Sequence, residues 1–281
     1  MQTVERVGEL RSAVARARSS GSRIGFVPTM GFLHEGHLSL VDEAKRRAEF
    51  VVMSVFVNPL QFAPTDDLSR YPRDPAGDAD KARLRGVNLL FIPGVNEVYP
   101  EERRVDVVPR ALHTRWEAAV RPGHFAGVLT VVAKLLNMVQ PDVTIFGQKD
   151  VQQATLVRAM VDDLNFATEV IVAPTARETD GLAMSSRNSY LDGAGRAEAS
   201  VLSRALFGMR DAFRRGERRA ESLIAAGRAV LGEEPMVTID YLAIADAATL
   251  EPIESVTPGS VAMVAARVGR TRLIDNVVLG Q

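Results

Sequence analysis

The chain alternates short, continuous apolar runs with stretches in which apolar residues recur every three or four positions. The runs are rich in β-branched residues and predict buried strands at residues 24–27, 51–57, 87–92, 143–146 and 167–172. The periodic stretches predict helices at residues 4–14, 38–48, 78–85, 128–139 and 152–164. Continuous apolar strands that alternate with helices indicate the α/β class, with a parallel sheet and helices on both of its faces.

The remainder of the chain follows a different order. Helices are predicted at residues 196–214 and 220–231, and strands follow at 237–243, 261–268 and 271–278 with no helix between them. Gly269-Arg270 suits a tight turn between the last two strands. We therefore expect a larger parallel-sheet domain at residues 1–175 and a smaller α+β domain with an antiparallel sheet at residues 176–281.

Composition narrows the possible functions without naming one. The chain has 281 residues, 46 % of them hydrophobic and 25 % charged, and a net charge of -1, which gives no basic excess for nucleic acid. It contains no cysteine, so disulfides, thiolate metal sites and a cysteine nucleophile are excluded. The N-terminus has no signal-peptide pattern, and no run approaches the ~18 apolar residues of a membrane span. We expect a cytoplasmic protein with neither a membrane nor a nucleic acid as partner.

Polar segments follow four of the predicted strands. Each is marked by Gly or Pro and is rich in hydrogen-bonding side chains: residues 28–37, 58–67, 147–153 and 177–187. Ligands of open parallel sheets bind beyond the carboxyl ends of the strands. Because these ends meet at one edge of the sheet, the four segments together predict a binding site there.

The first segment contains two of the four histidines, His34 and His37, where a strand is predicted to give way to a helix. The zinc-protease motif places its two histidines four positions apart, not three, and only His113 and His124 remain as further imidazole ligands. Simple capping of the helix is a second alternative. A phosphate site fits best, because Gly36 lets backbone N–H groups approach an anion and a helix N-terminus attracts negative charge.

The other segments offer groups that suit a phosphorylated ligand. Lys149 can contact a phosphate as a point charge, while Asp150 can cap the next helix or hold Mg²⁺. Residues 184–187 (Met-Ser-Ser-Arg) can grip a triphosphate through two hydroxyls and a bidentate arginine, although the same residues suit a turn. The neutral amides of Gln61 and Gln153 suit recognition of hydroxyl groups.

Three further features are less specific. Asn58 can orient a ligand, and His124 is equally compatible with a binding site and with a helix cap. Residues 63–75 are rich in Pro and Asp and predict a long loop beside the site, which is typical of a lid or of a plain connection.

Six segments, taken in order, resemble the pantoate–β-alanine ligase (pantothenate synthetase) family. They read VPTMGFLHEGHLSLV, SVFVNPLQF, YPRD, RPGHFAGV, FGQKDVQQ and DGLAMSSRN, and TRLIDN continues the likeness more loosely near the C-terminus. The H-x-G-H element alone is shared by a wide nucleotidyltransferase superfamily, whereas the other elements together are specific. The resemblance implies a Rossmann-like nucleotide-binding domain, a smaller C-terminal domain and, usually, a homodimer.

The resemblance also implies a two-step reaction. The carboxylate of (R)-pantoate attacks the α-phosphate of ATP, which gives pantoyl adenylate and pyrophosphate. The amine of β-alanine then attacks the activated acyl carbon, which gives pantothenate and AMP. Mg²⁺ accompanies ATP in this family. Since the substrate carboxylate is the nucleophile, cationic and hydrogen-bonding side chains are the expected machinery.

Matching the motif positions implies a role for each candidate residue. The residues implied for catalysis are His34, His37, Lys149 and Arg187, with His37 at the family's usual acid/base position. The residues implied for ATP binding are Met30, Gly31, His34, Gly36, His37, Gly147, Gln148, Lys149, Asp150, Ala176, Met184, Ser185, Ser186 and Arg187. Pantoate is implied to contact Gln61 and Gln153, β-alanine Gln61, and Mg²⁺ Asp150, with Asn58, Tyr71 and His124 as further candidates.

Two other functions remain open from the sequence. A cytidylyltransferase-like enzyme of the same superfamily would share His34 and His37, but it gives no reason for the paired Gln61 and Gln153. A nucleotide-binding or RNA-interaction module without catalysis would keep the fold, although the near-neutral charge disfavours RNA.

Overall fold

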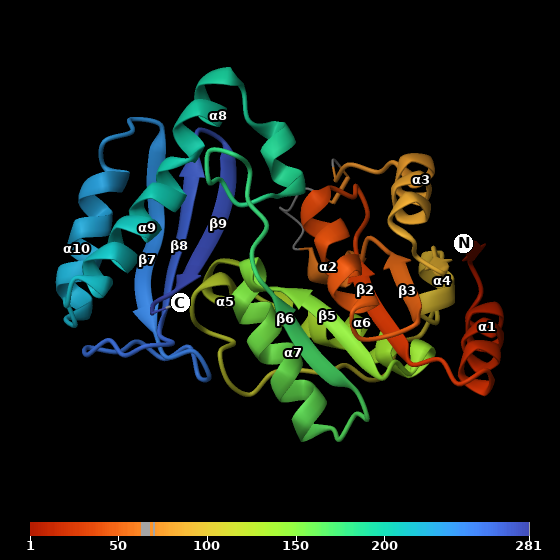
Figure 1. Cartoon of the computed structure of the whole chain (residues 1–281). Coiled ribbons are helices and arrows are strands. Elements are labelled where there is room, and N and C mark those ends of the chain that lie inside the picture. Colours follow the sequence, from red (N-terminus) through yellow and green to blue (C-terminus); the bar gives the residue numbers. More distant parts are fainter. Residues whose placement is uncertain (63–67, 70, 281) are drawn as a thin grey trace. The chain divides into compact units, whose positions relative to one another are not determined.

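A computed structural model describes residues 1–62, 68–69 and 71–280 of the chain. They form two compact units (Figure 1). Unit 1 comprises Met1–Gly147 and Gln152–Pro174, and unit 2 comprises Gln148–Val151 and Thr175–Gln281. The boundary at residues 175/176 stays a prediction, and the assignment of Gln148–Val151 to unit 2 was not foreseen. Residues 63–67 and 70 of the predicted lid loop lie outside the described residues.

Unit 1 is built on six strands, all paired in parallel, in the order β1-β4-β3-β2-β5-β6. They are β1 (Gln2–Val4), β2 (Ile24–Thr29), β3 (Phe50–Val55), β4 (Leu89–Phe91), β5 (Val143–Gly147) and β6 (Glu169–Ala173). The predicted α/β class is confirmed. One detail is wrong: Val4 lies in a strand paired with β4 rather than in the first helix, because sheet pairing overrides the helical spacing of the apolar residues.

Helices cover both faces of this sheet. They are α1 (Val7–Ser19), α2 (Glu35–Lys45), α3 (Pro75–Arg85), α4 (Val95–Val98), α5 (Glu117–Val120), α6 (His124–Val139) and α7 (Val151–Asp163), with a short 3₁₀ helix η1 (Pro59–Gln61). Neighbouring residues of β2 belong to different cores: Phe26 packs with α1 and α6, and Val27 with α2. This alternation explains why the strand is apolar throughout.

Unit 2 contains an antiparallel sheet in the order β7-β8-β9. Its strands are β7 (Val237–Ala245), β8 (Val261–Val268) and β9 (Thr271–Val278), and its helices are η2 (Gln148–Asp150), η3 (Ser186–Tyr190), α8 (Gly193–Ala199), α9 (Val201–Arg214) and α10 (Ala220–Leu231). The antiparallel sheet and the tight turn at Gly269-Arg270 are confirmed. The single helix predicted at 196–214 is instead two, divided at Ser200, whose hydroxyl bonds the carbonyl oxygen of Ala197.

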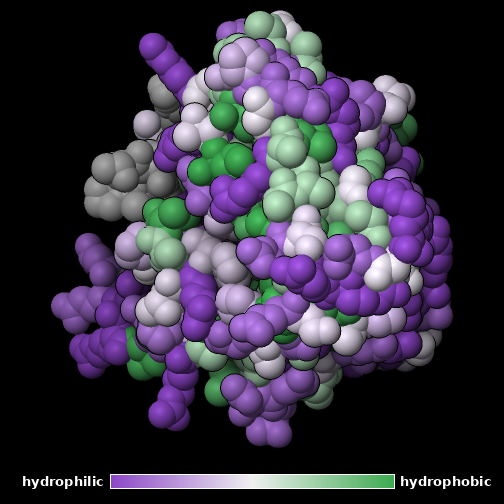
Figure 2. Space-filling view, turned by 90° about the vertical axis from the view of Figure 1, so that its left-hand side faces the viewer, coloured by the Kyte–Doolittle hydropathy of each residue, from purple (hydrophilic) through white to green (hydrophobic). Residues whose placement is uncertain are grey.

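The surface is that of an ordinary globular chain. Hydrophilic residues predominate on the face shown in Figure 2, with smaller apolar areas between them. Within the described ranges, no helix combines the length and apolarity needed to cross a bilayer.

Helix α6 packs directly on η1 at Gly127. A Cβ atom at this position would lie 2.3 Å from the carbonyl oxygen of Leu60 and 2.7 Å from the backbone nitrogen of Gln61. The Gly127 carbonyl oxygen also accepts a 3.1 Å hydrogen bond from Nδ2 of Asn58. A glycine is therefore required for η1, which carries Gln61, to lie against the helix.

The substitution Gly127→Ala is expected to lower the free energy of unfolding by about 1–3 kcal/mol, because the backbone of η1 must shift. Gly8→Ala is the matched control, since this helical glycine has nothing within 4 Å of a built Cβ atom. It should leave stability unchanged or raise it by up to about 1 kcal/mol. Denaturant unfolding measures both, and equal effects would contradict the packing argument.

Candidate functional site

Helix α3 fixes the segment that follows β2. The buried carboxylate of Asp78 accepts hydrogen bonds from the backbone nitrogens of Phe32 at 2.8 Å and Leu33 at 2.7 Å, one on each oxygen. One turn later, Lys81 donates to the Leu33 carbonyl oxygen at 2.8 Å. Gly31 has φ of 82°, and a Cβ atom there would lie 2.8 Å from Oδ2 of Asp78. Both the turn and the close approach of Asp78 therefore require glycine at this position.

His34 and His37 cap helix α2 reciprocally. Nδ1 of His34 accepts a 3.1 Å hydrogen bond from the Gly36 nitrogen, and Nδ1 of His37 accepts a 3.4 Å bond from the His34 nitrogen. In its neutral form each ring therefore carries its proton on Nε2 and can donate from there. The ring centroids are 4.1 Å apart, with the ring planes tilted by 38°. The capping alternative is correct, and it is compatible with binding of an anion.

Four backbone N–H groups of the segment expected to bind a phosphate already have partners within the protein. Gly31 donates its N–H to the Thr29 hydroxyl, Phe32 and Leu33 donate theirs to Asp78, and Gly36 donates its own to His34. These N–H groups are engaged in holding the loop itself. The two imidazoles are further donors that this segment can offer to an anion, and Met30, Gly31 and Gly36 stay candidates for contact with ATP.

A chain of directed hydrogen bonds sets the amide orientation of Gln61. Oδ1 of the buried Asn58 accepts from the Leu60 nitrogen at 3.2 Å and from the Tyr99 hydroxyl at 2.8 Å, and its Nδ2 donates to the Gly127 carbonyl oxygen. A backbone N–H and a backbone C=O have fixed polarity, so only one orientation of the Asn58 amide is possible. Its Nδ2 also donates to Oε1 of Gln61 at 3.0 Å.

As a result, Nε2 of Gln61 points away from Asn58 and lies 3.0 Å from Sδ of Met30. A thioether sulfur is a weak acceptor, and an amide N–H₂ has two hydrogens. The geometry therefore suits donation from Gln61 to a ligand oxygen. Burial raises the pKa of Tyr99, which keeps its hydroxyl protonated as the donor that this chain of bonds needs.

The side chain of His124 contacts the backbone of Gln61. Its Nδ1 lies 2.7 Å from the Gln61 carbonyl oxygen, which also accepts a 3.2 Å bond from Arg121. Tyr71 is buried, with its ring edge-on to Phe62 at a centroid distance of 5.9 Å.

The first turn of α7 carries two neighbouring glutamines with different surroundings. Gln153 is half-buried. Gln152 is buried, and its Nε2 donates to the carbonyl oxygens of Leu112 and Arg115. Gln152 is thus committed to holding a loop, whereas Gln153 stays the candidate for a ligand.

The remaining candidates belong to unit 2, apart from Gly147, the last residue of β5, which has nothing within 4 Å of a built Cβ atom. Ser185 caps η3 by accepting from the Arg187 nitrogen at 3.3 Å, so the expected turn is present. The Ala176 carbonyl oxygen accepts from the Met184 nitrogen at 2.9 Å. These bonds shape the segment that presents Ser186 and Arg187.

The structure offers no resident metal cluster in the part of the chain that it describes, where no three His, Cys, Asp or Glu side chains are grouped to hold an ion. Asp150 is a single half-exposed carboxylate, 3.7 Å from Nζ of Lys149. Mg²⁺ is commonly held by one or two carboxylates together with substrate phosphates. Asp150 therefore fits an ion that arrives with a nucleotide.

The sequence analysis did not single out several residues that hold the candidate segments in place: Asp78, Tyr99, Arg177, Asp275 and Asn276. Asp78 looks like any polar residue of an amphipathic helix, and Tyr99 follows no pattern. The pair Asp275-Asn276 did carry a signal, because two polar residues interrupt the apolar run of a predicted strand. A charged group at such a position must find a partner.

Comparison with known proteins identifies the family. The sequence model described as pantoate-beta-alanine ligase matches residues 2–278. The chain belongs to the pantoate-beta-alanine ligase family. Like the family, it is an ATP-dependent ligase that condenses pantoate with β-alanine through a pantoyl adenylate, as the sequence resemblance implied.

Individual relatives agree with this assignment. The chain is 51 % identical over 282 residues to the pantothenate synthetase of Pseudomonas entomophila, covering 99 % of this chain and 98 % of the relative. The crystal structure of pantothenate synthetase from Thermus thermophilus superposes with a TM-score of 0.95 at 49 % identity, covering 100 % of both chains.

A third relative contains ligands. The pantoate-beta-alanine ligase from Francisella tularensis, described as complexed with beta-gamma ATP and beta-alanine, gives a TM-score of 0.80 at 31 % identity, covering 100 % of this chain and 98 % of that one.

The substitution Asp78→Asn is expected to lower the free energy of unfolding of this ligase by about 1–3 kcal/mol, because one of the two backbone N–H groups would face an amide N–H₂. Asp80→Asn on the same helix is the control, since the Asp80 side chain is 62 % exposed and pairs with Arg83 at the surface. Its effect should stay below about 1 kcal/mol. Chemical denaturation measures both, and an Asp78 variant as stable as the control would refute the anchoring role.

Proposed function

We propose that His34, His37, Lys149 and Arg187 stabilise the negative charge that develops when the pantoate carboxylate attacks the α-phosphate of ATP. The observation that carries this proposal is the reciprocal capping of the two histidines, which directs the proton of each neutral ring to Nε2. Pyrophosphate bound to Mg²⁺ is a good leaving group, so donation of hydrogen bonds and charge neutralisation are larger needs than proton transfer.

The remaining roles follow from chemistry and burial. In this proposal ATP is bound by Met30, Gly31, Gly36, Gly147, Gln148, Asp150, Ala176, Met184, Ser185 and Ser186 together with the four charge-stabilising residues. Pantoate accepts hydrogen bonds from the amides of Gln61 and Gln153, and Gln61 also lies near β-alanine. The directed amide of Gln61 supports this assignment, since a donor is what a hydroxyl or carboxylate oxygen requires.

Three further properties belong to the same proposal. Mg²⁺ enters with ATP and contacts Asp150, where it supplies charge neutralisation for the phosphates. The enzyme works as a homodimer, and it is located in the cytoplasm. Small molecules are its substrates, and we propose neither a nucleic acid nor a membrane as a partner.

Isotope exchange between pyrophosphate and ATP tests the proposed first step. We expect exchange that requires pantoate and Mg²⁺ but not β-alanine, because adenylation precedes entry of the amine. Arg187→Ala and Lys149→Met should lower the exchange rate by about 10²-fold or more if these cations contact the phosphates. Exchange that needs CTP and a phosphorylated alcohol, or binding of ATP without exchange, would overturn the proposal.

Two substitutions distinguish hydrogen bonding by His37 from proton transfer by His37. His37→Gln keeps a donor and also keeps the cap, since glutamine at this helix position can bond the backbone nitrogen of residue 34. It should retain kcat/KM for pantoate within about tenfold, whereas His37→Ala should lose about 10²–10³-fold. If both variants lose activity equally and the alkaline limb of the pH profile disappears, proton donation rather than hydrogen bonding is the role of His37.

A further inference from the structure

Strand β9 is one of the two edge strands of the unit 2 sheet, and two of the proposed ATP-binding segments pack against it. These are η2, which contains Lys149, and η3, which contains Arg187. An edge strand leaves backbone groups unpaired, and proteins commonly cover them. In this ligase the covering elements are themselves candidates for contacting phosphate, so the strand is in a position to determine where they lie.

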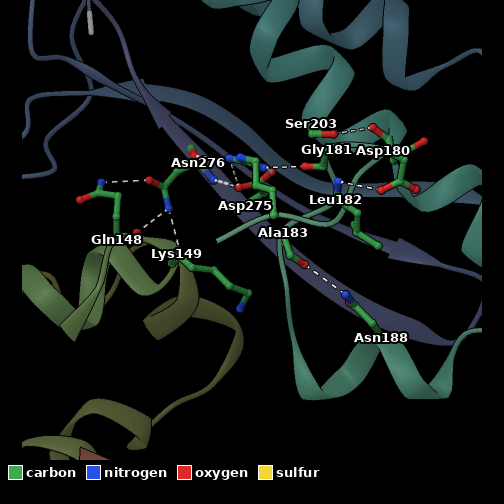
Figure 3. Close-up of polar contacts among 12 residues, drawn as sticks. Gln148, Lys149, Asp180, Gly181, Leu182, Ala183, Asn188, Ser203, Asp275 and Asn276 are labelled. Atoms are coloured by element: carbon green, nitrogen blue, oxygen red, sulfur yellow. Dashed lines mark hydrogen bonds and ion pairs between the residues drawn. The ribbon is translucent and has the colours of Figure 1, made fainter. Parts of the chain in front are cut away.

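Asn276 in β9 grips the backbone of η2. Its Nδ2 donates to the carbonyl oxygens of both Gln148 and Lys149, each at 2.9 Å, and its Oδ1 accepts from Nε2 of Gln148 at 3.0 Å (Figure 3). Asn276 is almost completely buried. Both hydrogens of its amide are thus used on one short segment.

The polarity of these bonds makes the arrangement specific. Two backbone carbonyl oxygens can only accept, so the amide of Asn276 must direct its N–H₂ group toward η2. An aspartate would present oxygens to oxygens, and a leucine of similar size would leave two buried acceptors unsatisfied. Only a side chain with two donors and one acceptor in this geometry satisfies every partner.

The neighbouring residue fixes the strand at the same point. Asp275 forms a two-bond ion pair with Arg177, at 2.7 Å and 2.9 Å, and accepts from the Asn276 nitrogen at 2.7 Å. Arg177 also donates to the carbonyl oxygens of Gly181 and Asn276, at 3.0 Å and 3.2 Å. Burial raises the pKa of Asp275, and the Arg177 guanidinium opposes that rise. The backbone nitrogen and the carbonyl oxygen of Asn276 are therefore both hydrogen-bonded, which fixes the position from which its side chain extends to η2.

We propose that Asn276 is a positioning residue for Lys149. By holding the two carbonyl oxygens of η2, it fixes the Cα atom from which the long lysine side chain extends, and Figure 3 shows that side chain running away from Asn276. A flexible lysine acts on a phosphate as a point charge, so the location of its backbone decides where the charge can reach. The inference rests on the proposed contact of Lys149 with ATP.

A double-mutant cycle measures this coupling. The variants are Lys149→Met, Asn276→Leu and the combination, and the readout is kcat/KM for ATP in pantoate-dependent pyrophosphate exchange. We expect Asn276→Leu to lose about tenfold in the native background but less than about twofold when Lys149 is already Met, because the two residues act through one charge. KM for pantoate should not change in Asn276→Leu, since the proposed pantoate contacts lie in unit 1.

Controls separate positioning from general destabilisation. Leu223→Ala removes a fully buried side chain of the unit 2 core. It should lower the melting temperature without changing kcat/KM for ATP, and its effect should be the same with Lys149 or Met at position 149. Asn276→Ser, which is too short to bond both carbonyl oxygens, serves as the second variant if Asn276→Leu does not fold.

The outcomes distinguish the inference from the proposal beneath it. An equal tenfold loss from Asn276→Leu in both backgrounds, or the same loss in Leu223→Ala, would show that Asn276 only stabilises the fold. A Lys149→Met variant with undiminished exchange would remove the proposed role of Lys149, and the positioning role with it. A large loss in Lys149→Met with full activity in both Asn276 variants would overturn the positioning role alone.

Discussion

The placement of the candidate residues depends on one constraint: a buried polar side chain must satisfy each of its polar atoms, and backbone partners of fixed polarity leave it one way to do so. Asp78 meets two N–H groups with two oxygens, Asn58 bonds one N–H and one C=O, and Asn276 bonds two carbonyl oxygens with two hydrogens. In each case these hydrogen bonds also fix the position of a neighbouring candidate residue. The loop before His34, the amide of Gln61 and the backbone of Lys149 are held in this way.

The candidate residues of the two units differ in chemical type. Unit 1 holds the imidazoles of His34 and His37 and the neutral amides of Gln61 and Gln153, while unit 2 holds Lys149 and the hydroxyls and arginine of residues 185–187. The short segment Gln148–Val151 is covalently continuous with β5 and α7 of unit 1, yet it packs with unit 2. Strand β9 explains this assignment, because the hydrogen bonds of Asn276 attach the segment to it.

Much of the fold was predictable because burial leaves a periodic pattern. The apolar runs of β2, β3 and β5 and the complete helix α10 follow the predicted spacing closely. One failure has a clear cause. Val4 pairs with a strand distant in sequence, so a particular contact overrode an average tendency.

The sequence by itself determined the class of fold, the order of its segments and the family, because those depend on periodicity and on motifs that are local in the chain. It also named the candidate residues. Only the tertiary structure decided their bonding: that Nδ1 of each histidine accepts a backbone hydrogen bond, that Gln61 directs a donor toward Met30, and that Asn276 bonds the segment bearing Lys149. Each of these depends on which atom faces which across the fold. A polar residue's type fixes what it can bond, whereas its partner is chosen by packing.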